Sequence, residues 1–131
     1  MEVLMDLSNA KIAANVAVSD LQRALKFYEE KLGLKTMALT DFFGAAMSSD
    51  GSTIALAQRE KVPSDEDCVN FTVKDIKATI KELESRGVIF QDYETERLKT
   101  VDHISEYKGF QAAWFKDSEG NTLQINQSPE Q

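Results

Sequence analysis

The sequence predicts an α+β protein built from two copies of one βαβββ unit. Three observations support this fold class. The sequence contains an internal repeat, and several segments alternate apolar and polar residues as strands do. After the first strand of each copy, apolar residues recur at the spacing of one helix face. The 131 residues suffice for one domain with its own core. We therefore expect a single domain over residues 1–131, with a first unit over 11–58 and a second over 67–127.

The repeat consists of three blocks that match in the same order. NVAVSDLQRALKFYEEK (15–31) aligns with NFTVKDIKATIKELESR (70–86), FGAAMSSD (43–50) with FQAAWFKD (110–117), and GSTIALAQ (51–58) with GNTLQINQ (120–127). The second copy carries about a dozen additional residues, within 95–108. Long segments of this kind are often functional, so a lid over a site and a surface elaboration are both open interpretations.

Each unit begins with a strand and a helix. KIAANVAV (11–18) and CVNFTV (68–73) alternate with a period of two, which predicts strands. The helices follow at once, because Asp20 and Asp75 stand at N-cap positions and Gly33 and Gly87 at the sites of left-handed C-terminal caps.

Three further strands complete each unit. They are predicted at 34–40, 43–49 and 52–58 in the first unit and at 88–94, 109–115 and 121–127 in the second. Neighbouring side chains on a strand point to opposite faces, so one of Trp114 and Phe115 faces a helix and the other does not. This alternation alone does not show which of the two faces the helix.

Composition and charge exclude several classes of function. Apolar residues make up 42% and charged residues 28%, as in globular proteins, and no run approaches the roughly 20 apolar residues of a membrane span. The net charge of −7 disfavours nucleic acid as a partner. The first residues do not resemble a signal peptide, and the lone Cys68 fits a reducing compartment. We expect a cytoplasmic protein with no membrane partner.

Two motifs resemble those of the vicinal oxygen chelate superfamily. V-S-D-L before a helix that ends F-Y-x-x-x-L-G-L (18–34), and F-K-D-x-x-G-N before the last strand (115–121), are similar to that group. It includes glyoxalase I, extradiol dioxygenases, fosfomycin-resistance proteins and bleomycin-binding proteins. The resemblance spans about 11–127 and implies two βαβββ modules that curl around a shared cleft, usually in a homodimer. It does not imply one function, because this scaffold hosts unrelated chemistries.

The resemblance also implies where a metal would bind. Metal-dependent members use His or Glu at four strand positions, which align here with Ala13, Ala55, Cys68 and Gln124. Alanine offers no donor atom, an amide oxygen is a weak ligand, and one thiolate does not complete the usual three protein ligands. We therefore expect neither a metal nor another cofactor.

Strand parity predicts a small, amide-rich cleft face, with the larger polar groups in the second unit. Amides orient a ligand by hydrogen bonds but are not effective bases. The alternative is a polar sheet face that simply meets water. The candidate ligand-binding residues are Asn15, Phe43, Cys68, Asn70, His103, Trp114, Gln124 and Asn126.

Two of these candidates have simpler alternatives. A free cysteine such as Cys68 is more often a small buried apolar residue than a nucleophile. A single histidine in a polar loop, as His103 is, is more often solvated than an acid or base.

The leading hypothesis is a metal-free protein that binds a small organic molecule, of the sequestration or resistance type, as a homodimer. One alternative is a lyase or isomerase of the glyoxalase kind with a rearranged or absent metal site. A second is a structural or regulatory dimer with a closed cleft. No catalytic residue is assigned, and whether the protein is an enzyme stays open at this point.

Overall fold

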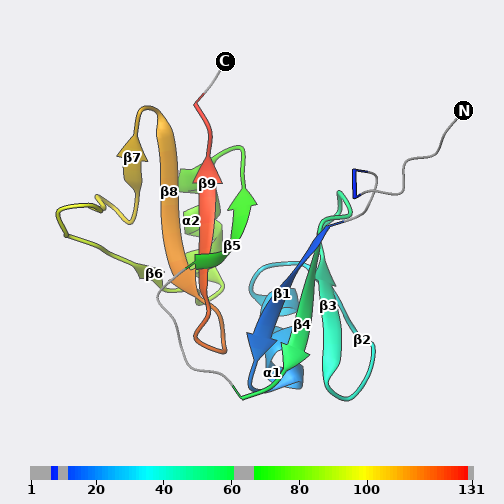
Figure 1. Cartoon of the computed structure of the whole chain (residues 1–131). Coiled ribbons are helices and arrows are strands. Elements are labelled where there is room, and N and C mark those ends of the chain that lie inside the picture. Colours follow the sequence, from blue (N-terminus) through cyan, green and yellow to red (C-terminus); the bar gives the residue numbers. More distant parts are fainter. Residues whose placement is uncertain (1–6, 9–11, 61–66, 130–131) are drawn as a thin grey trace, which may run out of the picture.

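Each half of the chain forms one mixed sheet covered by one helix in the computed structural model, which describes residues 7–8, 12–60 and 67–129 (Figure 1). The first sheet has the order β1 (Ala13–Val18), β4 (Thr53–Gln58), β3 (Phe43–Met47), β2 (Lys35–Ala38), with α1 over Leu21–Glu30. The second has the order β5 (Asp67–Thr72), β9 (Thr122–Gln127), β8 (Phe110–Lys116), β6 (Phe90–Gln91), with β7 (Ser105–Tyr107) also on β8 and α2 over Ile76–Ser85. The predicted fold class is confirmed.

The repeat in the sequence is also a repeat in strand pairing. β1 runs parallel to β4 with Asn15 opposite Ala55, and β5 runs parallel to β9 with Asn70 opposite Gln124. The remaining pairs in both sheets are antiparallel. The parallel strand pairs of the two copies therefore share one register, so that Asn15 and Ala55 of the first sheet correspond to Asn70 and Gln124 of the second.

The predicted helix caps are confirmed. The Asp20 carboxylate accepts a hydrogen bond from the amide of Arg23 at 3.1 Å, and Asp75 caps α2 in the same way. Gly33 and Gly87 adopt φ angles of 75° and 92°, which other residues reach only with strain. Neither described helix is long or apolar enough to span a bilayer.

The second unit departs from prediction between α2 and β8. The strand expected over 88–94 is reduced to β6. The backbone of Tyr93 pairs with Thr100 instead: the Tyr93 amide donates a hydrogen bond to the Thr100 hydroxyl, and the Thr100 amide donates one to the Tyr93 carbonyl, each at 2.9 Å. The added segment instead contributes β7, which was not predicted. β7 turns into β8 through Lys108 and Gly109, both at positive φ, as in a two-residue hairpin turn.

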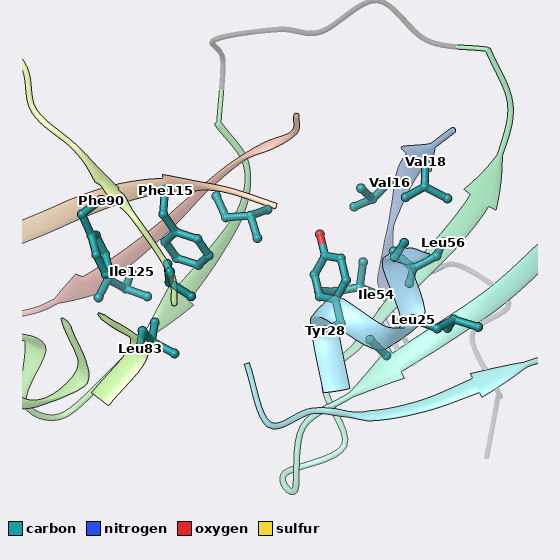
Figure 2. Close-up of a cluster of buried hydrophobic side chains, with 14 of the residues drawn as sticks. Val16, Val18, Leu25, Tyr28, Ile54, Leu56, Leu83, Phe90, Phe115 and Ile125 are labelled. Carbon is teal, nitrogen blue, oxygen red and sulfur yellow. The ribbon is translucent and has the colours of Figure 1, made fainter. Parts of the chain in front are cut away.

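The core lies between the sheets and their helices and extends through both units. Figure 2 shows its side chains in two groups, with Tyr28 on the side of its group that faces the second unit. The largest fully buried side chains are Tyr28, Phe115, Leu21, Leu56, Ile76 and Leu123. Because Phe115 is buried beneath α2, Trp114 takes the opposite face of β8, which settles the choice that parity left open.

Polar contacts join the β8–β9 turn of the second unit to α1 of the first. The Glu119 carboxylate, whose side chain is fully buried, accepts hydrogen bonds from the Ser19 hydroxyl at 2.8 Å and from Arg23 Nε at 2.6 Å. The Tyr28 hydroxyl donates to Asp117 at 2.7 Å. Burial of Tyr28 beside the Asp117 carboxylate raises the pKa of its phenol well above the ordinary value, so the phenol keeps its proton. These contacts hold the two units against each other.

Candidate functional site

The face of the second sheet opposite α2 carries a row of polar and aromatic side chains. Strand pairing places Gln91, Trp114, Gln124 and Asn70 opposite one another across β6, β8, β9 and β5. The next row holds Thr72 beside Asn126. We call this surface the amide face; it consists of Asn70, Thr72, Gln91, Trp114, Gln124 and Asn126.

Hydrogen bonds fix the orientation of the amides on this face. The Thr72 hydroxyl donates to Asn126 Oδ1 at 3.0 Å, and Asn126 Nδ2 donates to Gln124 Oε1 at 2.9 Å. The two bonds form a ladder across β5 and β9, in which each amide is held by a neighbour. Preorganised amides of this kind bind a ligand without the entropic cost of ordering them first.

An aromatic pair lies beside the ladder. The rings of Trp114 and Tyr93 meet edge to face, with centroids 5.5 Å apart and an interplanar angle of 83°. Both side chains are half-buried. Indole is amphipathic, so Trp114 offers a flat apolar surface next to the hydrogen-bonding groups of the ladder.

The equivalent face of the first sheet is different in character. Ala55 lies opposite Ala45 here, whereas Gln124 lies opposite Trp114 in the second sheet, although the sequence repeat aligns Trp114 with Met47. Asn15 is the amide of β1 on this face, and Phe43 lies near Ala57 with 37% of its surface exposed. The candidates Asn15 and Phe43 therefore lie on an alanine-rich sheet, separate from the amide face.

A cavity of about 780 Å³ lies between β5 and one end of the first sheet. Cys68, Asn70 and Thr72 line one side, and the turn between β3 and β4, including Asp50, lines the other. Hydrogen bonds from the Ser48 hydroxyl and from Ser52 lower the pKa of Asp50 to about 2. Asn70 and Thr72 therefore belong both to the amide face and to the lining of the cavity, which also contains a carboxylate that is charged at neutral pH.

Cys68 is exposed, so the expectation that its thiol would be buried is wrong. The pairing of β5 with β9 shifts register between Asp67 and Val69, and this irregularity removes Cys68 from the regular alternation of the strand. Its sulfur lies 3.6 Å from the Thr122 carbonyl oxygen, which is an acceptor and not a base that could activate the thiol.

His103 is placed on the helix side of the second sheet, away from the amide face. Its Nδ1 lies 2.9 Å from Asp92 Oδ1 and its Nε2 lies 3.4 Å from Glu84 Oε2 on α2. The imidazole also stacks on Phe90, with centroids 5.9 Å apart. Because Phe90 belongs to the core, His103 anchors the added segment to the back of the sheet, which favours a surface elaboration over a lid.

The four positions at which the resemblance implies metal ligands do not fit a metal ion here. Ala13 and Ala55 have no donor atom, and Cys68 and Gln124 together supply one thiol and one neutral amide. Within the part of the chain that the structure describes, no three His, Cys, Asp or Glu side chains gather in an arrangement suited to a metal ion.

Several residues of the site were absent from the predicted set. Gln91 and Tyr93 lie on or beside the amide face, and Asp50 lies in the cavity. Strand parity could have identified Gln91 and Tyr93, which are two residues apart and share a face. Nothing in the sequence indicates that the turn containing Asp50 faces β5.

Comparison with known proteins agrees with the fold. The family model of the Glyoxalase/Bleomycin resistance protein/Dioxygenase superfamily matches residues 11–125. A comparison with curated protein sequences gave no match.

Solved structures with the same fold include three bacterial proteins. A member of the same superfamily from Sphaerobacter thermophilus has a TM-score of 0.72 and 22% identity, covering 93% of this chain and 99% of its own. An antibiotic-binding protein from a Streptomyces species has a TM-score of 0.70 and 20% identity, covering 92% and 96%. A glyoxalase family protein from Bacillus anthracis has a TM-score of 0.69 and 15% identity, covering 98% and 99%. The chain belongs to the Glyoxalase/Bleomycin resistance protein/Dioxygenase superfamily.

Proposed function

We propose that this chain binds a small organic molecule on the amide face, without a metal, and sequesters the molecule instead of transforming it. The observation that carries the proposal is the hydrogen-bonded ladder of Thr72, Asn126 and Gln124 beside the indole of Trp114. The superfamily includes bleomycin resistance proteins, and one structural neighbour is an antibiotic-binding protein.

The chemistry of the face favours binding over catalysis. Neutral amides and hydroxyls donate and accept hydrogen bonds at fixed places, and they discriminate strongly against ligands that leave them unpaired. None of them transfers a proton efficiently at neutral pH. The imidazole of His103 is held by Asp92 and Glu84 on the opposite side of the sheet.

We also propose that the protein acts as a homodimer in the cytoplasm. The first sheet turns an apolar face outward, with Met37, Phe43 and Met47 exposed by 57%, 37% and 42%. An exposed apolar surface of this kind is typical of a face that a second protein surface covers. The single cysteine is consistent with a reducing compartment.

The only tryptophan of the chain makes the proposal directly testable. Because Trp114 lies on the amide face, a bound ligand changes its fluorescence. Titration with bleomycin and with a panel of aromatic and peptide antibiotics, in the presence of EDTA, should identify compounds that change this emission at micromolar concentration. Conversion of a bound compound into a product, followed by mass spectrometry, would contradict sequestration.

A further inference from the structure

The residues of β5 that line the cavity form an unbroken run. Cys68, Val69, Asn70, Phe71 and Thr72 all contribute to it. Side chains on a strand alternate between two faces, so a cavity that lies over one face would be lined by every second residue. A cavity lined by consecutive residues instead faces the edge of the strand, where its backbone groups are.

This edge of β5 has no strand beside it among the described residues. β5 is the terminal strand of the second sheet and pairs only with β9. The Val73 amide donates to the Asn126 carbonyl at 2.8 Å, which shows that the backbone groups of Val73 point toward β9. Backbone groups alternate along a strand, so those of Phe71 point the same way, whereas the N–H and C=O groups of Asn70 and Thr72 point into the cavity.

The opposite side of the cavity comes from the first unit. β1, which is also a terminal strand, contributes Ala14. Figure 1 shows β1 and β5 as the inner edges of the two sheets, facing each other. Farther along β1, the carbonyl of Ala17 accepts a hydrogen bond from Asn121 Nδ2 at 2.9 Å, so the second unit covers that part of the edge. The space that stays open lies next to β5 and the turn that contains Asp50.

We propose that the cavity binds an extended peptide-like molecule whose amide groups pair with Asn70 and Thr72 along the edge of β5 that lies beside no other described strand, and whose cationic amine lies near Asp50. Strand addition to a free sheet edge is a common mode of peptide recognition, since the backbone supplies affinity and side-chain pockets supply selectivity. A volume of about 780 Å³ lies within the range of small-molecule sites. The proposal rests on the proposed binding function and names its ligand class.

The charge of the cavity adds to this choice of ligand. The Asp50 carboxylate accepts hydrogen bonds from the Ser48 hydroxyl and the Ser52 amide, which hold it in place and keep it ionised. The chain as a whole carries a net charge of −7, which also favours cationic ligands over anionic ones. An extended amide chain with a free amine can form hydrogen bonds with the backbone groups of Asn70 and Thr72 and an ion pair with Asp50.

Two peptides that differ only in their backbone test the proposal. The first probe is the tetrapeptide amide Ala-Val-Ala-Val-NH2 with a free N-terminal amine, and the second is the same peptide with each internal amide nitrogen methylated. We expect the first probe to slow hydrogen exchange of the Asn70 and Thr72 backbone amides about tenfold, as measured by NMR on the intact chain. The methylated probe, which lacks the donors of a strand, should leave both rates unchanged.

The amine is tested separately with a charge-removing variant. Asp50→Asn keeps an oxygen acceptor for Ser48 and Ser52 but removes the charge, and it should weaken calorimetric binding of the free-amine probe about fivefold. Binding of the N-acetylated peptide should not change. Asp41→Asn, which removes an exposed carboxylate outside the cavity, is the matched control and should leave both affinities unchanged.

Three outcomes would overturn the inference. Equal protection by both probes would show that strand pairing is not involved. Protection of Asn70 and Thr72 without peptide, rising with protein concentration, would show that a second copy of the chain occupies the edge. No binding of either peptide, together with fluorescence-detected binding of other compounds by Trp114, would refute the peptide class and leave the proposed function standing.

Discussion

The Glu119 carboxylate is a buried ionised group that joins the two units. Burial raises its pKa, but hydrogen bonds from Arg23, Ser19, Ser118 and the Asp20 amide outweigh burial and lower the pKa to about 2, from an ordinary value of 4.5. The unfolded chain therefore binds a proton at higher pH than the folded chain does. The resulting stability is complete above about pH 5 and is lost as the pH falls from 4.5 toward 2.

Substitution of the Glu119 carboxylate should remove this pH dependence of stability. We predict that Glu119→Gln lowers the free energy of unfolding at pH 7 by about 3 kcal/mol, the equivalent of the pKa difference. Urea denaturation at pH 7 and pH 3 measures it, with Glu29→Gln on the exposed side of α1 as control. If wild-type protein and the Glu119 variant lost the same stability between these pH values, Glu119 would not be the group responsible.

Gln124 tests the amide face by comparison with the first unit. Gln124→Ala gives the second sheet the residue that the first has at Ala55, and it removes the acceptor for Asn126 Nδ2. We predict about tenfold weaker binding of any ligand that changes Trp114 emission, since one hydrogen bond contributes about 1.5 kcal/mol. Asn15→Ala, at the position equivalent to Asn70, should have no effect. Equal losses in both variants would place the ligand elsewhere.

The sequence alone does not determine which of Trp114 and Phe115 is buried. Alternation predicted that one of them faces a helix, but only the pairing of Phe115 with Phe90 and Leu123 identifies which one is buried. Cys68 was misplaced for a related reason, because the register shift at the start of β5 leaves no signal in the sequence.

Both helices begin against a glutamine that ends the last strand of their unit. Gln58 Oε1 accepts a hydrogen bond from the Leu21 amide and Gln127 Oε1 from the Ile76 amide, each at 2.7 Å. The first amides of a helix have no partner within the helix, so each glutamine ties its helix to its sheet. The shared glutamine was visible in the repeat, but its partner was not.

Substitution of either glutamine should lower the free energy of unfolding by a similar amount. We predict that Gln58→Ala and Gln127→Ala each lower the free energy of unfolding by about 1 kcal/mol, the contribution of one hydrogen bond. Chemical denaturation measures both, with Gln22→Ala on the exposed side of α1 as control. If only one of the two variants were destabilised, the two equivalent hydrogen bonds would not contribute equally to stability.

The added segment is held by His103 between Asp92 and Glu84. We predict that His103→Ala speeds hydrogen exchange of backbone amides in residues 94–104 about tenfold, because the segment loses its contacts with α2 and Phe90. The affinity measured through Trp114 should stay within about twofold of wild type. A larger change in affinity would restore the interpretation of this segment as a lid.

Most elements could be predicted, because their signals are local. The caps of both helices and the positions of seven strands follow from Asp, Gly and alternating apolar residues near each boundary. The strand over 88–94 failed because the contacts of Tyr93 with Thr100 compete with the sheet. The turn formed by Lys108 and Gly109 was a recognisable hairpin signal that could have located β7.

The two units have the same fold and different surfaces. The repeat predicted the common fold, yet the contacts that join the units, such as those of Tyr28 with Asp117, connect residues that are distant in the sequence. One sheet presents the amide face and the other an alanine-rich face with exposed methionines. The second unit therefore carries the hydrogen-bonding side chains, and the first carries the apolar surface.

An NMR screen of several hundred neutral aromatic amides against the isotope-labelled chain in EDTA tests whether the amide face binds organic molecules without a metal. Signals that move should cluster at the Trp114 indole and the side-chain amides of Asn70, Gln124 and Asn126. Fragments that bind only elsewhere, or that bind this face only after EDTA is replaced by a divalent metal, would contradict the claim.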